Sequence, residues 1–365
     1  MLRVEGLNKT FVTGEGEVEA VRDVSFEVKT GEFFALLGSS GCGKTTTLRC
    51  IAGLEIPDSG EIWINEKLVF SSKKGLMVPV HEREIGMVFQ SYAVWPHMSV
   101  TQNVGYPLIH GRHRLPKGET AKRVKNVLQM VQLGDLEKRP ASLLSGGQQQ
   151  RVAVARALVA APELLLFDEP LSNLDAKLRV EMRQELRDLF ERLKLTALYV
   201  THDQEEALVL SHRIAVMHGG QIVQLGTPME IYKEPANLFV AGFVGTTNVI
   251  HGRVLSTDWG GSGCVETPVG QLCCPLSPDI KAGQSVPVMF RPEAVMIHTE
   301  RCEPHDNIIP GAVKSAVFTG SRVGYEIKSG EFHIRAETSP YMAEIKKGQL
   351  VWLELPIDRL RVLVT

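Results

Sequence analysis

The stretch GSSGCGKTT, from Gly38 to Thr46, follows the apolar run FFALL at 33–37 and precedes a helical pattern at 45–52. It matches the pattern GxxxxGK followed by Ser or Thr, in which backbone N–H groups and the N-terminus of a helix surround phosphate oxygens. Lys44 can neutralise the β and γ phosphates of ATP, and Thr45 can ligate magnesium. An ordinary Gly-rich turn is the alternative interpretation. The stretch predicts an ATP site made of Gly38, Ser39, Ser40, Gly41, Cys42, Gly43, Lys44, Thr45 and Thr46.

Apolar runs alternate with helical patterns around this stretch, up to about residue 242. This alternation indicates an α/β architecture with buried strands, and we expect those strands at 33–37, 164–167, 198–201 and 214–217. The expected helices are 45–52, 119–132, 147–159 and 176–194. The fold class predicted for residues 1–242 is therefore an α/β phosphate-binding-loop nucleotide-binding domain.

Short β-rich runs separated by Gly, Pro and Ser fill residues 243–365. The expected strands are 249–254, 285–290, 311–318, 325–328, 331–336 and 349–355. Strands at such short spacing indicate a small barrel or a pair of barrels. The sequence thus predicts a second, all-β domain.

Two carboxylates follow the apolar run LLLF at 164–167. Asp168 is suited to the coordination shell of magnesium, and Glu169 to polarising the water that attacks the γ phosphate. An acidic pair after a strand is by default a helix cap, but the phosphate-binding pattern upstream favours the catalytic interpretation.

A third motif, LSGGQQQR at 144–151, has no evident task inside one subunit. Its small residues allow close backbone approach, and the helix beginning near Gly147 offers the positive end of its dipole. A flexible turn is the alternative. A second phosphate-binding element in one chain points to an ATPase that works as two subunits, with Ser145, Gly146, Gly147 and Gln148 as further ATP-binding residues.

These motifs, in this order, resemble the ATP-binding cassette (ABC) family, for which LSGGQ is the signature. The resemblance implies a helical subdomain at about 90–160 and a head-to-tail homodimer in which ATP lies between Lys44 of one subunit and the signature of the other. It also implies roles for four more residues: adenine stacking for Phe11, magnesium and partner contact for Gln90, the subunit-interface loop for Asp175, and γ-phosphate contact for His202. Taken singly, each residue has a structural alternative. Phe11 would be a core residue and Gln90 a surface residue. Asp175 would be a helix N-cap, and His202 a structural histidine.

Within the family, the β-rich tail and the strings QSYAVWPHMS and LYVTHDQEEA resemble importer ATPases with a transport-associated oligonucleotide-binding-like (TOBE) domain, most of all the ferric-ion ATPases. The resemblance implies ATP and Mg²⁺ as cofactors, two transmembrane permease subunits as partners, and an external solute-binding protein as an indirect partner. The permeases would dock on residues 90–100, where Tyr92, Trp95 and Met98 are apolar; a hydrophobic anchor into the helical subdomain is the alternative. Polyamine, sugar, sulfate and phosphonate are the other solutes that remain open.

Composition restricts the other function classes. The 365 residues are 44% hydrophobic and 22% charged, with a formal net charge of -2. An ABC ATPase that acts on nucleic acid is the alternative from another class. The balanced charge argues against it, because charge-driven nucleic-acid binding needs an excess of basic residues. A regulatory subunit without turnover is a third, disfavoured by Glu169 and His202.

No stretch has the apolar length of a signal or a membrane helix. We therefore expect a peripheral protein on the cytoplasmic face of the inner membrane. The six cysteines show no paired spacing and are expected to be reduced thiols. A soft-metal site at the adjacent Cys273 and Cys274 is a weaker alternative to burial or chance.

Overall fold

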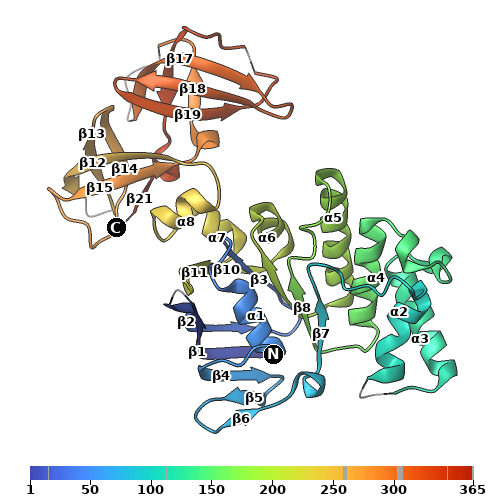
Figure 1. Cartoon of the computed structure of the whole chain (residues 1–365). Coiled ribbons are helices and arrows are strands. Elements are labelled where there is room, and N and C mark those ends of the chain that lie inside the picture. Colours follow the sequence, from blue (N-terminus) through green and yellow to red (C-terminus); the bar gives the residue numbers. More distant parts are fainter. Residues whose placement is uncertain (15, 112–113, 258–260, 302–306, 343, 364–365) are drawn as a thin grey trace. The chain divides into compact units, whose positions relative to one another are not determined.

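The computed structural model describes residues 1–14, 16–111, 114–257, 261–301, 307–342 and 344–363. The chain folds into two compact units, Met1–Pro228 and Met229–Thr365 (Figure 1). The sequence composition predicts the domain boundary at about residue 242 instead. Helices α7 (Pro228–Lys233) and α8 (Leu238–Phe243) occupy the segment between the predicted and the observed boundary.

A six-stranded sheet in the order β11-β10-β3-β9-β8-β7 is the centre of the first unit. All its neighbouring strands are parallel except β11, which pairs antiparallel with β10. The bounds are β3 (Phe33–Gly38), β7 (Ile85–Val88), β8 (Leu164–Asp168), β9 (Ala197–Thr201), β10 (Arg213–His218) and β11 (Gln221–Gly226). Every residue of β3, β8 and β9 is buried, as expected for parallel strands covered on both faces.

Alternate residues of these strands enter two different cores. Phe33, Phe167 and Tyr199 pack with the helices on one face, whereas Phe34 and Leu198 pack with α1 and the N-terminal strands on the other. This alternation is the period-2 geometry of a strand, and it explains why the strands appear as unbroken apolar runs in the sequence.

The N-terminal strands form an antiparallel sheet in the order β2-β1-β4-β5-β6, which the sequence reasoning did not anticipate. Its strands are β1 (Leu2–Thr13), β2 (Gly16–Val28), β4 (Ser59–Ile64), β5 (Lys67–Ser71) and β6 (Leu76–Met77). Several register shifts interrupt β1, and these irregularities obscure the simple alternation by which a strand is recognised in a sequence.

The four expected helices are confirmed within two residues at each end: α1 (Lys44–Ala52), α3 (Lys117–Met130), α4 (Gly146–Leu158) and α5 (Ala176–Leu193). Helix α6 (Gln204–Leu210) and helix α2 (Val100–His110) were not predicted. Gly105 and Pro107 count against helix in any propensity argument, yet Ser99 and Gln102 cap α2 reciprocally and its apolar side packs into the core. Figure 1 shows α2, α3 and α4 grouped together beyond β7 and β8, as expected for a helical subdomain.

The second unit contains two five-stranded antiparallel sheets, β14-β13-β12-β15-β21 and β16-β20-β17-β18-β19. Residues of both sheets contribute to one core, which includes Val265, Val288, Ile327 and Leu353. The bounds are β12 (Asn248–Thr257), β13 (Ser262–Thr267), β14 (Gly270–Pro275), β15 (Ser285–Phe290), β16 (Met296–His298), β17 (Ile308–Phe318), β18 (Val323–Ser329), β19 (Phe332–Thr338), β20 (Leu350–Glu354) and β21 (Arg361–Val362). The six expected strands are all present; the hairpin β13–β14 was missed because it is rich in Gly and Cys.

Within the described residues, no helix combines the length and the apolar character that crossing a bilayer requires.

Candidate functional site

Three adjacent parallel strands end at the predicted site. The order β3-β9-β8 brings together the segments that leave their carboxyl ends: the loop at 38–43, the turn at His202, and Asp168 with Glu169. Segments at the carboxyl ends of neighbouring parallel strands share one edge of the sheet, which is where open α/β sheets bind ligands. The fold thus assembles residues that lie more than a hundred positions apart in the sequence.

The loop after β3 has the backbone shape of an anion cradle. Gly41 and Gly43 have φ of 81° and 99°, values that residues with side chains rarely adopt. A Cβ at Gly43 would also lie 2.1 Å from the carbonyl oxygen of Ala20, so no other residue fits there. Helix α1 begins at the next residue and directs its free N–H groups toward the loop.

Lys44 is a buried cation with neutral partners. Its side chain is folded back, and Nζ donates to the carbonyl oxygens of Gly38 and Ser39 at 2.9 and 2.8 Å. The residue is only 4% exposed, and among the described residues it forms no ion pair. A buried ammonium that forms no ion pair is costly, so this site fits an anionic group such as a phosphate.

Thr45 and Asp168 meet beside Lys44. The Thr45 hydroxyl donates to Oδ1 of Asp168 at 2.9 Å, which joins the first turn of α1 to the end of β8. Burial raises the pKa of the Asp168 carboxyl, and the Thr45 hydrogen bond, Arg49 and Lys44 oppose that rise. A hydroxyl and a carboxylate at this separation are oxygen ligands of the kind that Mg²⁺ takes, so the pair fits the expected metal.

Glu169 is held in an unusual backbone conformation. Its φ is 46°, in the left-handed region, and its N–H donates to the carbonyl of Val200 at 3.0 Å. The side chain faces His202, whose Nδ1 lies 3.0 Å from Oε2 of Glu169. Non-glycine residues in this region are strained and often functional. The structure brings together five predicted residues: Lys44, Thr45, Asp168, Glu169 and His202.

A buried network that the sequence reasoning missed holds the turn of His202. The carboxylate of Glu206 accepts from the hydroxyls of Tyr199 and Thr201, both at 2.8 Å. The Thr201 hydroxyl also accepts from the N–H of Asp203 at 3.0 Å, so it is bonded on both sides of the histidine turn. The string YVTHDQEEA gave no signal for this, because the pairing depends on a turn that brings a strand tyrosine onto a helix glutamate.

The signature residues lie elsewhere in the first unit. Ser145 and Gln148 form a capping box at the start of α4: Oγ of Ser145 accepts from the N–H of Gln148, and Oε1 of Gln148 accepts from the N–H of Ser145. Gly147 packs against α5, where a Cβ would lie 3.1 Å from Cδ1 of Leu178. No hydrogen bond between described residues links 145–148 to the loop at 38–46. The structure therefore does not bring the two motifs together within one chain.

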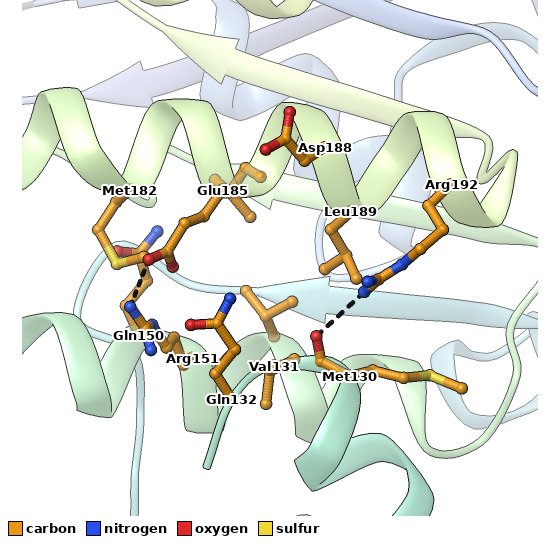
Figure 2. Close-up of a pocket in the computed structure, with 12 residues that line it drawn as sticks. Met130, Val131, Gln132, Gln150, Arg151, Met182, Glu185, Asp188, Leu189 and Arg192 are labelled. Atoms are coloured by element: carbon orange, nitrogen blue, oxygen red, sulfur yellow. Dashed lines mark hydrogen bonds and ion pairs between the residues drawn. The ribbon is translucent and has the colours of Figure 1, made fainter.

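A small pocket lies between α4, α5 and the end of α3 (Figure 2). Arg151 forms an ion pair with Glu185 across it, and Arg192 donates to the carbonyl of Met130 at 3.2 Å. Burial raises the pKa of Glu185, and Arg151 opposes the rise. The ion pair thereby connects α4, the helix that starts at the signature, to α5. Asp175 caps α5 by accepting from the N–H of Leu178.

The remaining predicted residues occupy surface positions. Phe11 lies on β1, with Nζ of Lys9 5.1 Å from its ring centre. Gln90 is exposed, and its carbonyl accepts from Nδ2 of Asn173 at 2.8 Å, which connects it to the loop of Asp175. The structural alternative raised for Asp175, a helix N-cap, is present in the structure.

The segment after Gln90 is anchored by an arginine that the sequence reasoning also missed. Tyr92 and Ala93 have φ of 60° and 47°, and Arg156 of α4 donates to both of their carbonyls, at 2.7 and 2.6 Å. The same guanidinium lies 4.8 Å from the ring of Trp95. Tyr92 is buried, so for this residue the anchor interpretation holds, whereas Trp95 borders a groove shared with Met87, Phe89 and Pro107.

Comparison with known proteins places these motifs in context. A family model described as "ABC transporter" matches residues 21–172, and one described as "TOBE domain" matches residues 288–363. A "Fe(3+) ions import ATP-binding protein" of Fusobacterium nucleatum is 40% identical over 99% of this chain and 92% of its own length. A "Spermidine/putrescine import ATP-binding protein" of Thermobifida fusca is 41% identical over 96% and 90%.

Two further comparisons each cover less than two thirds of this chain. A "Trehalose/maltose import ATP-binding protein" of Thermococcus litoralis is 55% identical over 63% of this chain, which spans 62% of that relative. The solved ATP-binding cassette MJ0796, a dimer "bound to ADP and Pi", superposes with a TM-score of 0.54 and 33% identity, over 62% of this chain and 99% of that one.

Proposed function

The chain belongs to the ATP-binding cassette importer ATPases that carry a TOBE domain, and on that premise we propose that it hydrolyses ATP to drive the uptake of ferric ion. The observation that carries the ATPase part is the cluster of Lys44, Thr45, Asp168, Glu169 and His202 at one sheet edge. The solute is the finer part of the proposal. It rests on the resemblance of the strings QSYAVWPHMS and LYVTHDQEEA to ferric-ion ATPases, whereas the relatives above are named for ferric ion, spermidine/putrescine and trehalose/maltose alike.

The cluster can divide the work of hydrolysis among its side chains. Lys44 holds phosphate charge, and the backbone N–H groups of 39–45 surround the same oxygens. Glu169 takes the proton of the attacking water, with His202 orienting its carboxylate and contacting the γ phosphate. Magnesium, when bound by Thr45, Asp168 and Gln90, would supply charge stabilisation on the phosphate oxygens.

We assign the signature to a second copy of this chain. Ser145, Gly146, Gly147 and Gln148 present a capped helix N-terminus that no described residue of the same ATP site contacts. The Ser145 hydroxyl accepts within its own capping box, so its proton stays available to an incoming phosphate. A head-to-tail homodimer gives this element its ligand, with Phe11 beside the adenine and Asp175 at the interface.

Partner membrane subunits would dock beside the segment 90–100. The groove bordered by Phe89, Trp95 and Pro107 is apolar and lies next to Gln90, which contacts the loop of Asp175 through Asn173. A contact in this groove would lie beside Gln90, the residue assigned above to magnesium. Two permeases and an external solute-binding protein complete the proposed importer, with this chain on the cytoplasmic face of the membrane.

The experiment has two arms that test the two parts separately. Purified protein should release phosphate from ATP only with magnesium present; no release under any divalent cation would refute the ATPase assignment. For the solute, the binding protein encoded beside this gene should bind ferric ion in preference to spermidine and maltodextrin. Selective binding of either competitor would reassign the cargo and leave the ATPase untouched.

Binding to nucleic acid, the alternative from a different class, gives a third outcome. Tight, salt-dependent retention of DNA or RNA by the protein would favour it. We expect none, because the formal net charge of -2 offers no broad basic surface.

A further inference from the structure

Two cysteines face each other across a hairpin of the second unit. Cys264 lies on β13 and Cys273 on β14, and the register of these antiparallel strands places them directly opposite one another. Their sulfur atoms are 2.9 Å apart, and both residues are partly exposed. Eight residues separate them in the sequence without any recognisable motif, so the spacing gave no indication of the pair.

The backbone geometry at this pair suits a covalent link. The N–H of Cys273 donates to Oδ1 of Asn307 at 2.6 Å, and its carbonyl accepts from Nδ2 of Asn307 at 2.7 Å. Both backbone groups of Cys273 therefore point away from β13, which makes Cys264 and Cys273 a non-hydrogen-bonded pair. Such pairs have Cα atoms about 4.5 Å apart. That separation lies inside the range of about 4.4–6.8 Å found for disulfides.

The other described cysteines have no such opportunity. Cys274 follows Cys273 directly but points to the opposite face of the strand and is buried, and burial raises its pKa to about 12. Burial likewise raises the pKa of Cys50 to about 12. A metal site at Cys273 and Cys274 is therefore disfavoured, because successive strand residues point to opposite faces. Cys302 lies outside the described residues.

We propose that Cys264 and Cys273 form a modification site, a dithiol that is converted to an intrachain disulfide by exchange with a small-molecule disulfide such as oxidised glutathione. One protein thiolate attacks the small disulfide, forms a mixed disulfide and releases one thiol. The second protein thiolate then attacks the protein sulfur of the mixed disulfide and releases the second thiol. The two hydrogens lost by the cysteines end on the two released thiols, so atoms and electrons balance. The link ties edge strand β14 to β13.

The test uses the full-length protein, oxidised glutathione and mass spectrometry after the remaining thiols are alkylated. No Lys or Arg lies between Arg253 and Lys281, so trypsin leaves Cys264, Cys273 and Cys274 in one peptide. Cleavage after Glu266 separates Cys264 from the other two. We expect the two fragments to stay joined after oxidation and to separate on addition of a reductant.

Substitutions identify the partners. Cys274→Ser should keep the cross-link, and Cys264→Ser or Cys273→Ser should abolish it while leaving ATP hydrolysis unchanged, which shows that the variants are folded. Loss of the link in Cys274→Ser would overturn the proposal. So would a link from either cysteine to Cys302, or glutathione retained as a stable mixed disulfide on both thiols.

Discussion

The Nδ1 atom of His202 lies 3.0 Å from Oε2 of Glu169, although the two residues are 33 positions apart in the sequence. The contact exists because β8 and β9 are parallel neighbours, so the residues that follow them emerge at the same edge. Glu169 stays at a positive φ in this arrangement, held by its N–H bond to Val200. A strained glutamate in contact with a histidine is the arrangement expected of a water-activating pair.

Replacing Glu169 by glutamine should separate ATP binding from hydrolysis. Glu169→Gln keeps the shape and the contact with His202 but removes the proton acceptor, so phosphate release should fall on the order of 10²–10⁴-fold. Because the nucleotide is no longer consumed, ATP-bound dimers should accumulate on size-exclusion chromatography. Glu191→Gln, at an exposed glutamate that pairs with Arg187, serves as the control and should hydrolyse at the normal rate. Wild-type turnover in Glu169→Gln would show that another group activates the water.

The chain contains a matched pair of helix caps that isolates the role of the signature. Ser145 and Ser99 form the same capping box, with Gln148 and Gln102 respectively. Ser145→Ala and Ser99→Ala should each cost about 1 kcal/mol of stability, measured by chemical denaturation. Only Ser145→Ala should weaken ATP-dependent dimerisation, since only this hydroxyl is assigned to a partner's phosphate. Equal effects of both substitutions on dimerisation would reduce the signature serine to a structural cap.

The buried hydroxyl of Tyr199 should stabilise the fold in a pH-dependent way. Burial raises the pKa of Glu206 above its ordinary value of 4.5, and the Thr201 and Tyr199 hydroxyls oppose the rise. A carboxyl with a raised folded pKa contributes stability below its unfolded pKa, and this contribution is lost as the pH rises through the folded pKa. Tyr199→Phe removes a donor to the ionised form, so the folded pKa rises further and the loss at higher pH becomes larger.

The stability gap between wild type and Tyr199→Phe should therefore widen from mildly acidic to mildly alkaline pH. Above the folded pKa it should reach roughly 1.5–3 kcal/mol, the range for a hydrogen bond to a charged group. Denaturant midpoints over a series of pH values measure the gap, and Tyr341→Phe, at a fully exposed tyrosine, is the control. A gap that is constant with pH would show that the Tyr199 hydroxyl does not change the titration of Glu206 in this range, which contradicts the prediction.

The sequence predicted those parts of the site that depend on one segment at a time. The loop at 38–46, the acidic pair after β8 and the histidine after β9 each follow an apolar strand, so their chemistry could be inferred from neighbours in the chain. Arg156, Glu206 and Asn307 escaped prediction because each acts on residues that only the folded topology brings near. The same limit hid helix α2, whose Gly105 and Pro107 are tolerated because its capping box and its buried face outweigh their propensities.

Arg83 should contribute more to stability than any exposed arginine of the first unit, because it donates hydrogen bonds to carbonyls in the last turn of α1, the helix that starts at the phosphate loop. Its Nη1 donates to the carbonyls of Cys50 and Ile51 at 2.9 and 2.6 Å, and its Nε donates to the carbonyl of Val78 at 3.0 Å. Burial lowers the pKa of this guanidinium to about 10, which still leaves it charged at neutral pH.

The carbonyls of Cys50 and Ile51 belong to the last turn of α1, where the intrahelical donors run out. The Cys50 carbonyl also accepts from the N–H of the capping residue Gly53 at 3.1 Å. Arg83→Met fills a similar volume but removes the charged donor to the carbonyls of Cys50 and Ile51, as well as the bond to Val78. We expect a loss of about 2–4 kcal/mol, because the charged hydrogen bonds are lost and part of the loss is recovered by relaxation. Arg187→Met, which removes only a surface pair with Glu191, should cost less than about 1 kcal/mol. Thermal denaturation of both variants measures the difference. If the two lose the same amount, water replaces Arg83 at the end of α1, and the stability of the phosphate loop does not depend on this arginine.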